Sequence, residues 1–253
     1  MIVTANIAIQ FGSKPLFENI SMKFGNGNRY GLIGANGCGK STLLNILGLL
    51  DNPTGGEYHF AGHEVSKYTE RQRAMLRKEN IGFVFQSYNL IPVLTAKENV
   101  EFLMLLQKRD ENERNERTTK LLKAVGLEDQ INKKPNEMSG GQQQRVAVAR
   151  ALASKPDFIL ADEPTANLDS KSTANLLDIM QRLNQEEKRK NQDRQTHGQQ
   201  GHKLRWPCLL EVAVCLDQYG AEKFHGILLS VEIVLSAGEI NRPLWSSRTR
   251  FAD

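Results

Sequence analysis

The sequence has few cysteines and no strong excess of charge of one sign. Its 253 residues include only three cysteines, Cys38, Cys208 and Cys215, and the formal net charge is +4. Cysteines at these separations form neither a disulfide framework nor a metal-binding pattern, so a reducing compartment is the default expectation. So small a charge gives no reason to expect a nucleic-acid partner. The composition therefore argues against a disulfide-stabilised secreted domain and against a nucleic-acid-binding protein.

Long hydrophobic runs are also missing. A membrane-spanning helix needs about 18 or more successive apolar residues, whereas the apolar stretch 227–237 is short and contains Glu232. Residues 1–4 lack the order of basic and then apolar residues that a signal peptide shows. If this protein acts at a membrane, we expect another chain to cross it.

The length suits one large α/β domain with room for a small subdomain. Apolar runs predict buried strands, and apolar residues at helical spacing predict helices, of which the one starting near residue 95 should bury Val100, Leu103 and Leu106. Gly126 suits the C-terminal end of the helix expected at residues 111–125. The strands are expected at residues 2–9, 19–24, 29–33, 81–85 and 158–161. The helices are expected at residues 39–50, from 95, 111–125, 139–153 and 170–184.

A phosphate-binding loop lies between the third strand and the first helix. The motif reads Gly34-Ala35-Asn36-Gly37-Cys38-Gly39-Lys40-Ser41. Its glycines let backbone N–H groups surround phosphate oxygens at a helix N-terminus. Lys40 would reach the outer phosphates, Ser41 would bind Mg²⁺, and Thr42 is the next donor. Cys38 in this loop is either a redox-sensitive thiol or a residue that only fills space. The motif predicts an ATP and Mg²⁺ site in a P-loop NTPase.

Two carboxylates end the strand at 158–161. Asp162 lies closest to the loop and suits a magnesium ligand, whereas Glu163, one residue further, suits polarisation of the attacking water. A strand that ends in two acids is weak evidence by itself, because most such pairs are surface turns. It gains weight after a P-loop.

A second glycine-rich turn opens the helix at 139–153, with the sequence Ser139-Gly140-Gly141-Gln142. It can be an ordinary helix N-cap, or a second anion site at a helix N-terminus. The stretch resembles the signature sequence of ABC-type ATPases, with Met138 in place of the usual leucine.

The resemblance implies an ABC-type nucleotide-binding domain that works in pairs, since in that family the signature of one subunit closes on the nucleotide held by another. It implies that Gln86 belongs to the Q-loop and binds Mg²⁺ or water, and that Asp169 lies in the D-loop at the dimer interface. It also implies that Phe11 stacks on adenine, although a lone phenylalanine is more often a core residue.

The resemblance differs along the chain. Residues 1–44 look most like soluble ABC-F proteins that act at the ribosome, and residues 43–188 look like ATPases of lipoprotein-releasing and macrolide-export transporters. The second resemblance implies an integral membrane permease as partner and a cytoplasmic, peripheral place at the inner face of the cell membrane. The alternatives are an ABC-F-like factor and a catalytically impaired ATP-binding fragment.

The family pattern is lost after residue 188. Residues 189–205 contain a single aliphatic residue, Leu204, and are expected to be loop or disorder that leaves a gap in the sheet or an exposed edge. His197 is either the histidine that contacts the γ-phosphate or a solvated loop residue. The runs 208–216 and 227–235 suit strands or short helices. We therefore expect a nucleotide-binding domain at 1–188, with a helical subdomain at about 87–150, and an atypical, partly disordered tail at 189–253.

Overall fold

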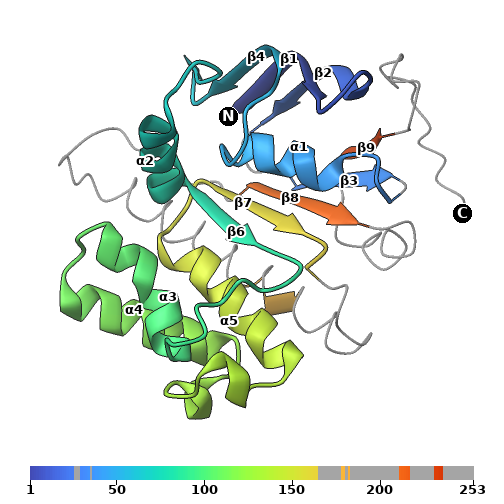
Figure 1. The fold of residues 1–253 in the computed structure, drawn as a ribbon. Helices are drawn as coiled ribbons and strands as arrows, with labels where there is room; N and C mark the ends of the chain where they lie inside the picture. Colours follow the sequence, from blue (N-terminus) through green and yellow to red (C-terminus); the bar gives the residue numbers. More distant parts are fainter. Residues whose placement is uncertain are drawn as a thin grey trace, which may run out of the picture.

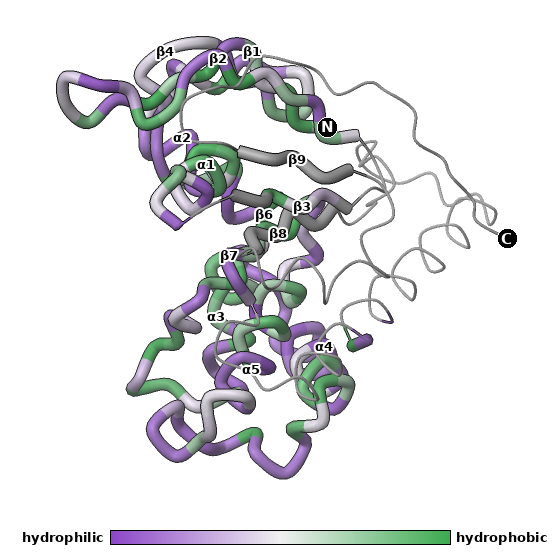
Figure 2. Tube along the Cα trace, turned by 90° about the vertical axis from the view of Figure 1, so that its right-hand side faces the viewer, coloured by the Kyte–Doolittle hydropathy of each residue, from purple (hydrophilic) through white to green (hydrophobic). Residues whose placement is uncertain are grey.

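The computed structural model describes residues 1–25, 29–34, 36–164, 178–179, 182, 211–216 and 231–235. In Figure 1 these residues form three tiers: an antiparallel sheet, a parallel sheet with helices beside it, and a separate group of helices. Figure 2 shows the same tiers from the side. The α/β class expected from the sequence is confirmed.

The antiparallel sheet has the strand order β2-β1-β4-β5. Strands β1 (Ile2–Gln10) and β2 (Pro15–Phe24) confirm the first two predictions and extend them. Strand β4 (Gly55–Phe60) and the short β5 (His63–Glu64) were not predicted. In β4 only Tyr58 and Phe60 are fully buried, so the alternating signal in the sequence is too short to detect.

The parallel sheet has the order β6-β7-β8-β3-β9. Its strands are β6 (Ile81–Val84), β7 (Phe158–Asp162), β8 (Glu211–Leu216), β3 (Arg29–Gly34) and β9 (Val231–Leu235). Strand β8 pairs with β7 on one side and with β3 on the other, which places Cys215 opposite both Asp162 and Leu32. The expected gap in the sheet is therefore wrong, because the apolar run 211–216 supplies the strand that residues 189–205 cannot.

Strand β7 is buried on both faces. Ile159 and Ala161 pack in the core beneath the helices, whereas Phe158 and Leu160 pack in the core shared with α1 and the antiparallel sheet. A parallel strand covered on both faces needs a continuous apolar run, which explains why its sequence signal was clear.

Helix α1 (Lys40–Leu47) lies between the two sheets (Figure 1) and ends at Gly48, earlier than residue 50. Helix α2 (Glu70–Asn80) was not predicted, because none of its residues is fully buried; the capping box between Thr69 and Gln72 begins it.

Helices α3 (Ala96–Leu106), α4 (Glu111–Ala124) and α5 (Gly140–Ala153) pack together in one core cluster, with two short 3-10 turns, η1 (Glu128–Gln130) and η2 (Pro135–Glu137), between them. Gly126 follows α4 with a left-handed φ of 67°, as expected of a glycine after a helix.

The expected apolar stripe on α3 is partly wrong. Val100 is fully buried, but Leu103 is only half-buried and Leu106 is 50% exposed. The buried face instead follows the spacings of three, four and eight residues and consists of Ala96, Asn99, Val100 and Met104. An α-helix has 3.6 residues per turn, so side chains spaced strictly by three residues move off the buried face within two turns.

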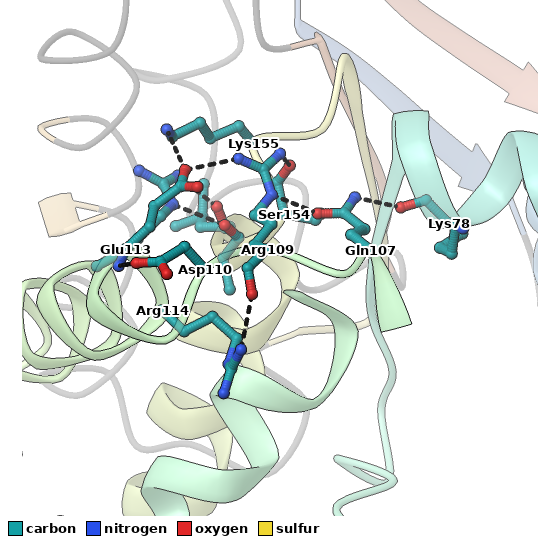
Figure 3. A network of polar contacts seen from close by, with 11 residues as sticks. Lys78, Gln107, Arg109, Asp110, Glu113, Arg114, Ser154 and Lys155 are labelled. Carbon is teal, nitrogen blue, oxygen red and sulfur yellow. Dashed lines mark hydrogen bonds and ion pairs between the residues drawn. The ribbon is translucent and has the colours of Figure 1, made fainter. Parts of the chain in front are cut away.

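A polar network joins the C-terminal end of α5 to α4 and α2 (Figure 3). Arg117 donates to the carbonyls of Leu152 and Ala153, both at 2.6 Å, and so satisfies the last turn of α5. Glu113 accepts from Arg109 at 2.7 Å and from Lys155 at 3.2 Å. The network fixes this end of α5 against the body of the domain.

Several sequence expectations fall on residues that the structure does not describe. Residues 178, 179 and 182 are helical, and Ile179 is buried, but most of the helix expected at 170–184 lies outside the described part. Residues 189–205, with His197, lie outside it as well. The division of the chain at residue 188 stays a prediction. Among the described residues, no helix is long and apolar enough to cross a membrane.

Candidate functional site

The phosphate-binding loop has the predicted context. Strand β3 ends at Gly34 and helix α1 begins at Lys40, while Ala35 lies outside the described residues. Gly37 and Gly39 have φ angles of 81° and 93°, in the left-handed region that favours glycine. A Cβ at Gly39 would also lie 2.9 Å from Cδ1 of Phe17, so glycine is needed there for space as well as for conformation.

The last two residues of the motif, Lys40 and Ser41, and the next residue, Thr42, form the first turn of α1. Lys40 is 6% exposed in the first turn, Ser41 is exposed and Thr42 is half-buried. Gly39 caps α1 without a side-chain hydrogen bond. The N-terminal end of a helix carries partial positive charge, and with the Lys40 ammonium it suits an anion.

Two other residues singled out in this region have clear positions. Cys38 is buried in the core cluster shared with α1, which agrees with the interpretation that it fills space. Asn36 is exposed. Phe11 is 71% exposed, so it is not a core residue; its stacking on adenine stays a prediction.

The two carboxylates at the C-terminal end of β7 lie in different environments. Oδ1 of Asp162 is buried and has no hydrogen-bond partner among the described residues. Glu163 has a left-handed φ of 43°, and its Oε2 accepts a 3.0 Å hydrogen bond from Nε2 of Gln86, which follows β6. An unpaired buried carboxylate oxygen suits a cation, and a side chain oriented by an amide suits a general base.

The signature turn begins α5 as an N-cap. Oγ of Ser139 accepts from the backbone N of Gln142 at 3.3 Å, and Oε1 of Gln142 accepts from the backbone N of Ser139 at 2.8 Å. This capping box occupies two of the N–H groups expected to meet an anion. Gly140 and Gly141 complete the first turn. The N-cap interpretation is therefore correct, and a role in binding nucleotide stays a prediction.

The structure adds residues that were not predicted. Nε2 of Gln144 donates to the carbonyl of Pro164 at 2.7 Å, directly after Glu163. Arg150 donates to the carbonyl of Tyr88 at 2.8 Å and to that of Asn89. Burial lowers the pKa of the Arg150 guanidinium.

One sequence signal could have found Gln144. It stands three, four and seven residues before buried positions of the same helix, so it lies on the buried face although the two residues before it are also glutamines. Those buried positions are Ala147, Val148 and Ala151.

The structure brings together Gln86, Asp162 and Glu163, and the P-loop leads into α1, which contacts β7. Asp169 and His197 lie outside the described residues. Within the described part, no group of three or more His, Cys, Asp or Glu side chains could hold a metal by itself.

Comparison with known proteins agrees with this geometry. The ABC transporter family model matches residues 17–166. An uncharacterized ABC transporter ATP-binding protein of Methanocaldococcus jannaschii is 52% identical over 168 residues, which cover 66% of this chain and 75% of that protein. The lipoprotein-releasing system ATP-binding protein LolD of Aquifex aeolicus is 48% identical over 67% of this chain and 76% of its own length.

Two further similarities concern a longer protein and a solved structure. The macrolide export ATP-binding/permease protein MacB of Campylobacter jejuni is 45% identical over 74% of this chain, but the match spans only 29% of MacB. A dimeric ATP-binding cassette in a post-hydrolysis state, bound to ADP and Pi, superposes with a TM-score of 0.76 and 35% identity over 96% of this chain and 97% of its own. The chain therefore belongs to the ABC transporter family, as one of its ATP-binding, ATP-hydrolysing α/β cassettes.

Proposed function

We propose that two copies of this chain close into a dimer around two ATP molecules and that hydrolysis reopens the dimer. This cycle of closing and opening would move a separate membrane protein. One observation carries this proposal. The carboxylate of Glu163 accepts a 3.0 Å hydrogen bond from Gln86. Glu163 directly follows Asp162, the last residue of β7, and β7 pairs with β6. A base, its orienting amide and a cation ligand therefore meet at one edge of the sheet.

Mg²⁺ fits the residues at this edge. The buried, unpaired Oδ1 of Asp162 supplies a carboxylate oxygen, and Ser41 and Gln86 supply a hydroxyl and an amide, which are oxygen ligands that Mg²⁺ accepts. When bound, the ion would offset the negative charge of the phosphates.

The protein side chains then have separate tasks. Lys40, at the start of α1, attracts the outer phosphates. The Glu163 carboxylate accepts a hydrogen bond from the attacking water, and Gln86 fixes the direction in which this carboxylate points. The expected roles of Phe11 at adenine and of His197 at the γ-phosphate remain part of the proposal.

A second subunit would complete each site. The signature residues Ser139, Gly140, Gly141 and Gln142 would meet the ATP held by the partner, with Asp169 at the interface. The capping box between Ser139 and Gln142 would then exchange its internal hydrogen bonds for bonds to phosphate oxygens.

The membrane partner we propose is a permease of the lipoprotein-release or macrolide-export type, which places the chain at the inner face of the cell membrane. The similarity to LolD and to the ATP-binding part of MacB supports this choice.

The test uses Glu163→Gln, which keeps the shape of the side chain and removes its charge. With Mg·ATP this variant should form a stable dimer in light scattering and should lose turnover. Glu128→Gln, at an exposed position of η1, is the matched control and should behave like the parent. A Glu163→Gln protein that stays monomeric at saturating ATP would contradict the proposal.

Partner choice is tested separately by recovering the tagged protein from membranes. A permease in the recovered material supports the transporter function. Ribosomes without a permease would favour the ABC-F-like alternative.

A further inference from the structure

Helix α5 contacts the turn formed by Glu163 and Pro164 of its own chain, here called the catalytic turn. Gln144 is 1% exposed, and its Nε2 donates to the carbonyl oxygen of Pro164 at 2.7 Å. Pro164 directly follows Glu163, whose φ of 43° is unusual for a residue with a side chain. A turn in this conformation needs contacts that hold it.

The same helix also holds the segment that follows Gln86, the hydrogen-bond partner of Glu163. Arg150 donates to the carbonyls of Tyr88 and Asn89, which lie two and three residues after Gln86 and have φ angles of 61° and 47°. Two irregular turns, one after each of two neighbouring strands, are therefore fixed to α5. Their side chains meet in the hydrogen bond between Gln86 and Glu163.

We propose that Gln144 is a positioning residue, which holds the turn at Glu163 and Pro164 so that the Glu163 carboxylate points at the attacking water. This inference rests on the proposed function. Its consequence is that α5 serves two sites, because its first turn would meet the partner's ATP while Gln144 orients the base beside the chain's own ATP.

The environment of Gln144 offers a selective substitution. Its Oε1 is buried and has no hydrogen-bond partner among the described residues. Gln144→Met has nearly the same volume and helix propensity, removes the donor to Pro164, and also removes this unpaired oxygen. The loss and the gain act in opposite directions on stability, so turnover can change without unfolding.

Gln130→Met is the matched control. The Oε1 of Gln130 is likewise buried and unpaired among the described residues, but the residue belongs to η1, which follows α4, and not to α5. It reports the effect of the same chemical change elsewhere in the protein.

The experiment compares kcat, the Kd for ATP and Tm of the parent and both variants. Gln144→Met should lower kcat by about ten- to hundredfold, because small displacements of a reacting group have effects of this size, and should leave Kd unchanged. In the Glu163→Gln background it should leave the ATP-dependent dimer intact. A kcat equal to that of Gln130→Met, or a Kd that rises as much as kcat falls, would overturn the proposal.

A second measurement needs no turnover and no dimer. Amide hydrogen exchange of Asp162 and Glu163 in the nucleotide-free protein should become faster in Gln144→Met than in the parent and in Gln130→Met. Unchanged exchange would overturn the positioning role, whereas failure of Glu163→Gln to dimerise would count only against the proposed function.

Discussion

The backbone of Gly140 packs against the hydroxyl of Tyr88, since a Cβ added at Gly140 would be 2.9 Å from Oη of Tyr88. The signature turn and the segment after Gln86 therefore touch within one chain. Arg150, further along α5, binds the carbonyl of the same tyrosine at 2.8 Å. The first turn of α5 is thus packed against the segment that follows Gln86.

This contact predicts an energetic coupling between Gly140 and Tyr88. Gly140→Ala should destabilise the protein more in the parent than in a Tyr88→Phe background, by about 0.5–1 kcal/mol, because the new methyl group meets the hydroxyl only in the parent. Urea unfolding of the two single variants and the double variant measures the difference. Equal effects in both backgrounds would show that the tyrosine ring moves aside without cost.

Lys40 should be required for nucleotide binding. Lys40→Ala removes the ammonium group at the start of α1 and should weaken the binding of Mg·ATP by about tenfold or more, as expected for the loss of charge-assisted hydrogen bonds. Isothermal titration measures the Kd. Lys67→Ala, whose parent side chain is 87% exposed, should leave it unchanged. Affinity within a factor of about two of the parent would show that the phosphate site lies elsewhere.

Gly82 of β6 lies against the backbone of α5. A Cβ there would be 2.3 Å from the carbonyl oxygen of Ala151, which cannot move without shifting the helix. Gly82→Ala should lower the free energy of unfolding by about 1–3 kcal/mol. At Gly12, by contrast, a Cβ would meet nothing within 4 Å, so Gly12→Ala should have little effect in the same denaturant titration.

The network in Figure 3 should make the free energy of unfolding depend on pH in the acidic range. Partial burial raises the pKa of Glu113, but hydrogen bonds and attraction from Arg109 and Lys155 outweigh it, so the pKa lies below its ordinary value of 4.5. Just below pH 4.5 the unfolded chain therefore binds more protons at this residue than the folded protein does. The stabilisation is present above that pH and is lost as the pH falls through the folded pKa.

Urea unfolding between pH 7 and pH 3 tests this expectation. Glu113→Gln should reduce the loss of unfolding free energy on acidification, and Glu128→Gln should leave it as in the parent. A Glu113→Gln protein with the full acid dependence would show that the network contributes no pH-dependent stability.

The local sequence was enough to predict the phosphate-binding loop and the strands buried on both faces. Loop chemistry depends on neighbouring residues from Gly34 to Ser41, and a strand buried on both faces, such as β7, needs a continuous apolar run. Exposed elements escaped prediction because they leave weak patterns: α2 buries none of its residues completely, and β4 buries only two.

The sequence by itself therefore determined the family and the positions of the glycine-rich loop and of the two acids, Asp162 and Glu163. Only the tertiary structure decided that residues 211–216 complete the sheet between β7 and β3, because strand pairing is set by contacts between distant segments and not by local periodicity. It also decided the partner of Gln144. Helical spacing sets Gln144 on the buried face, apart from Gln142 and Gln143, but only the packing of α5 places its side chain against the carbonyl of Pro164.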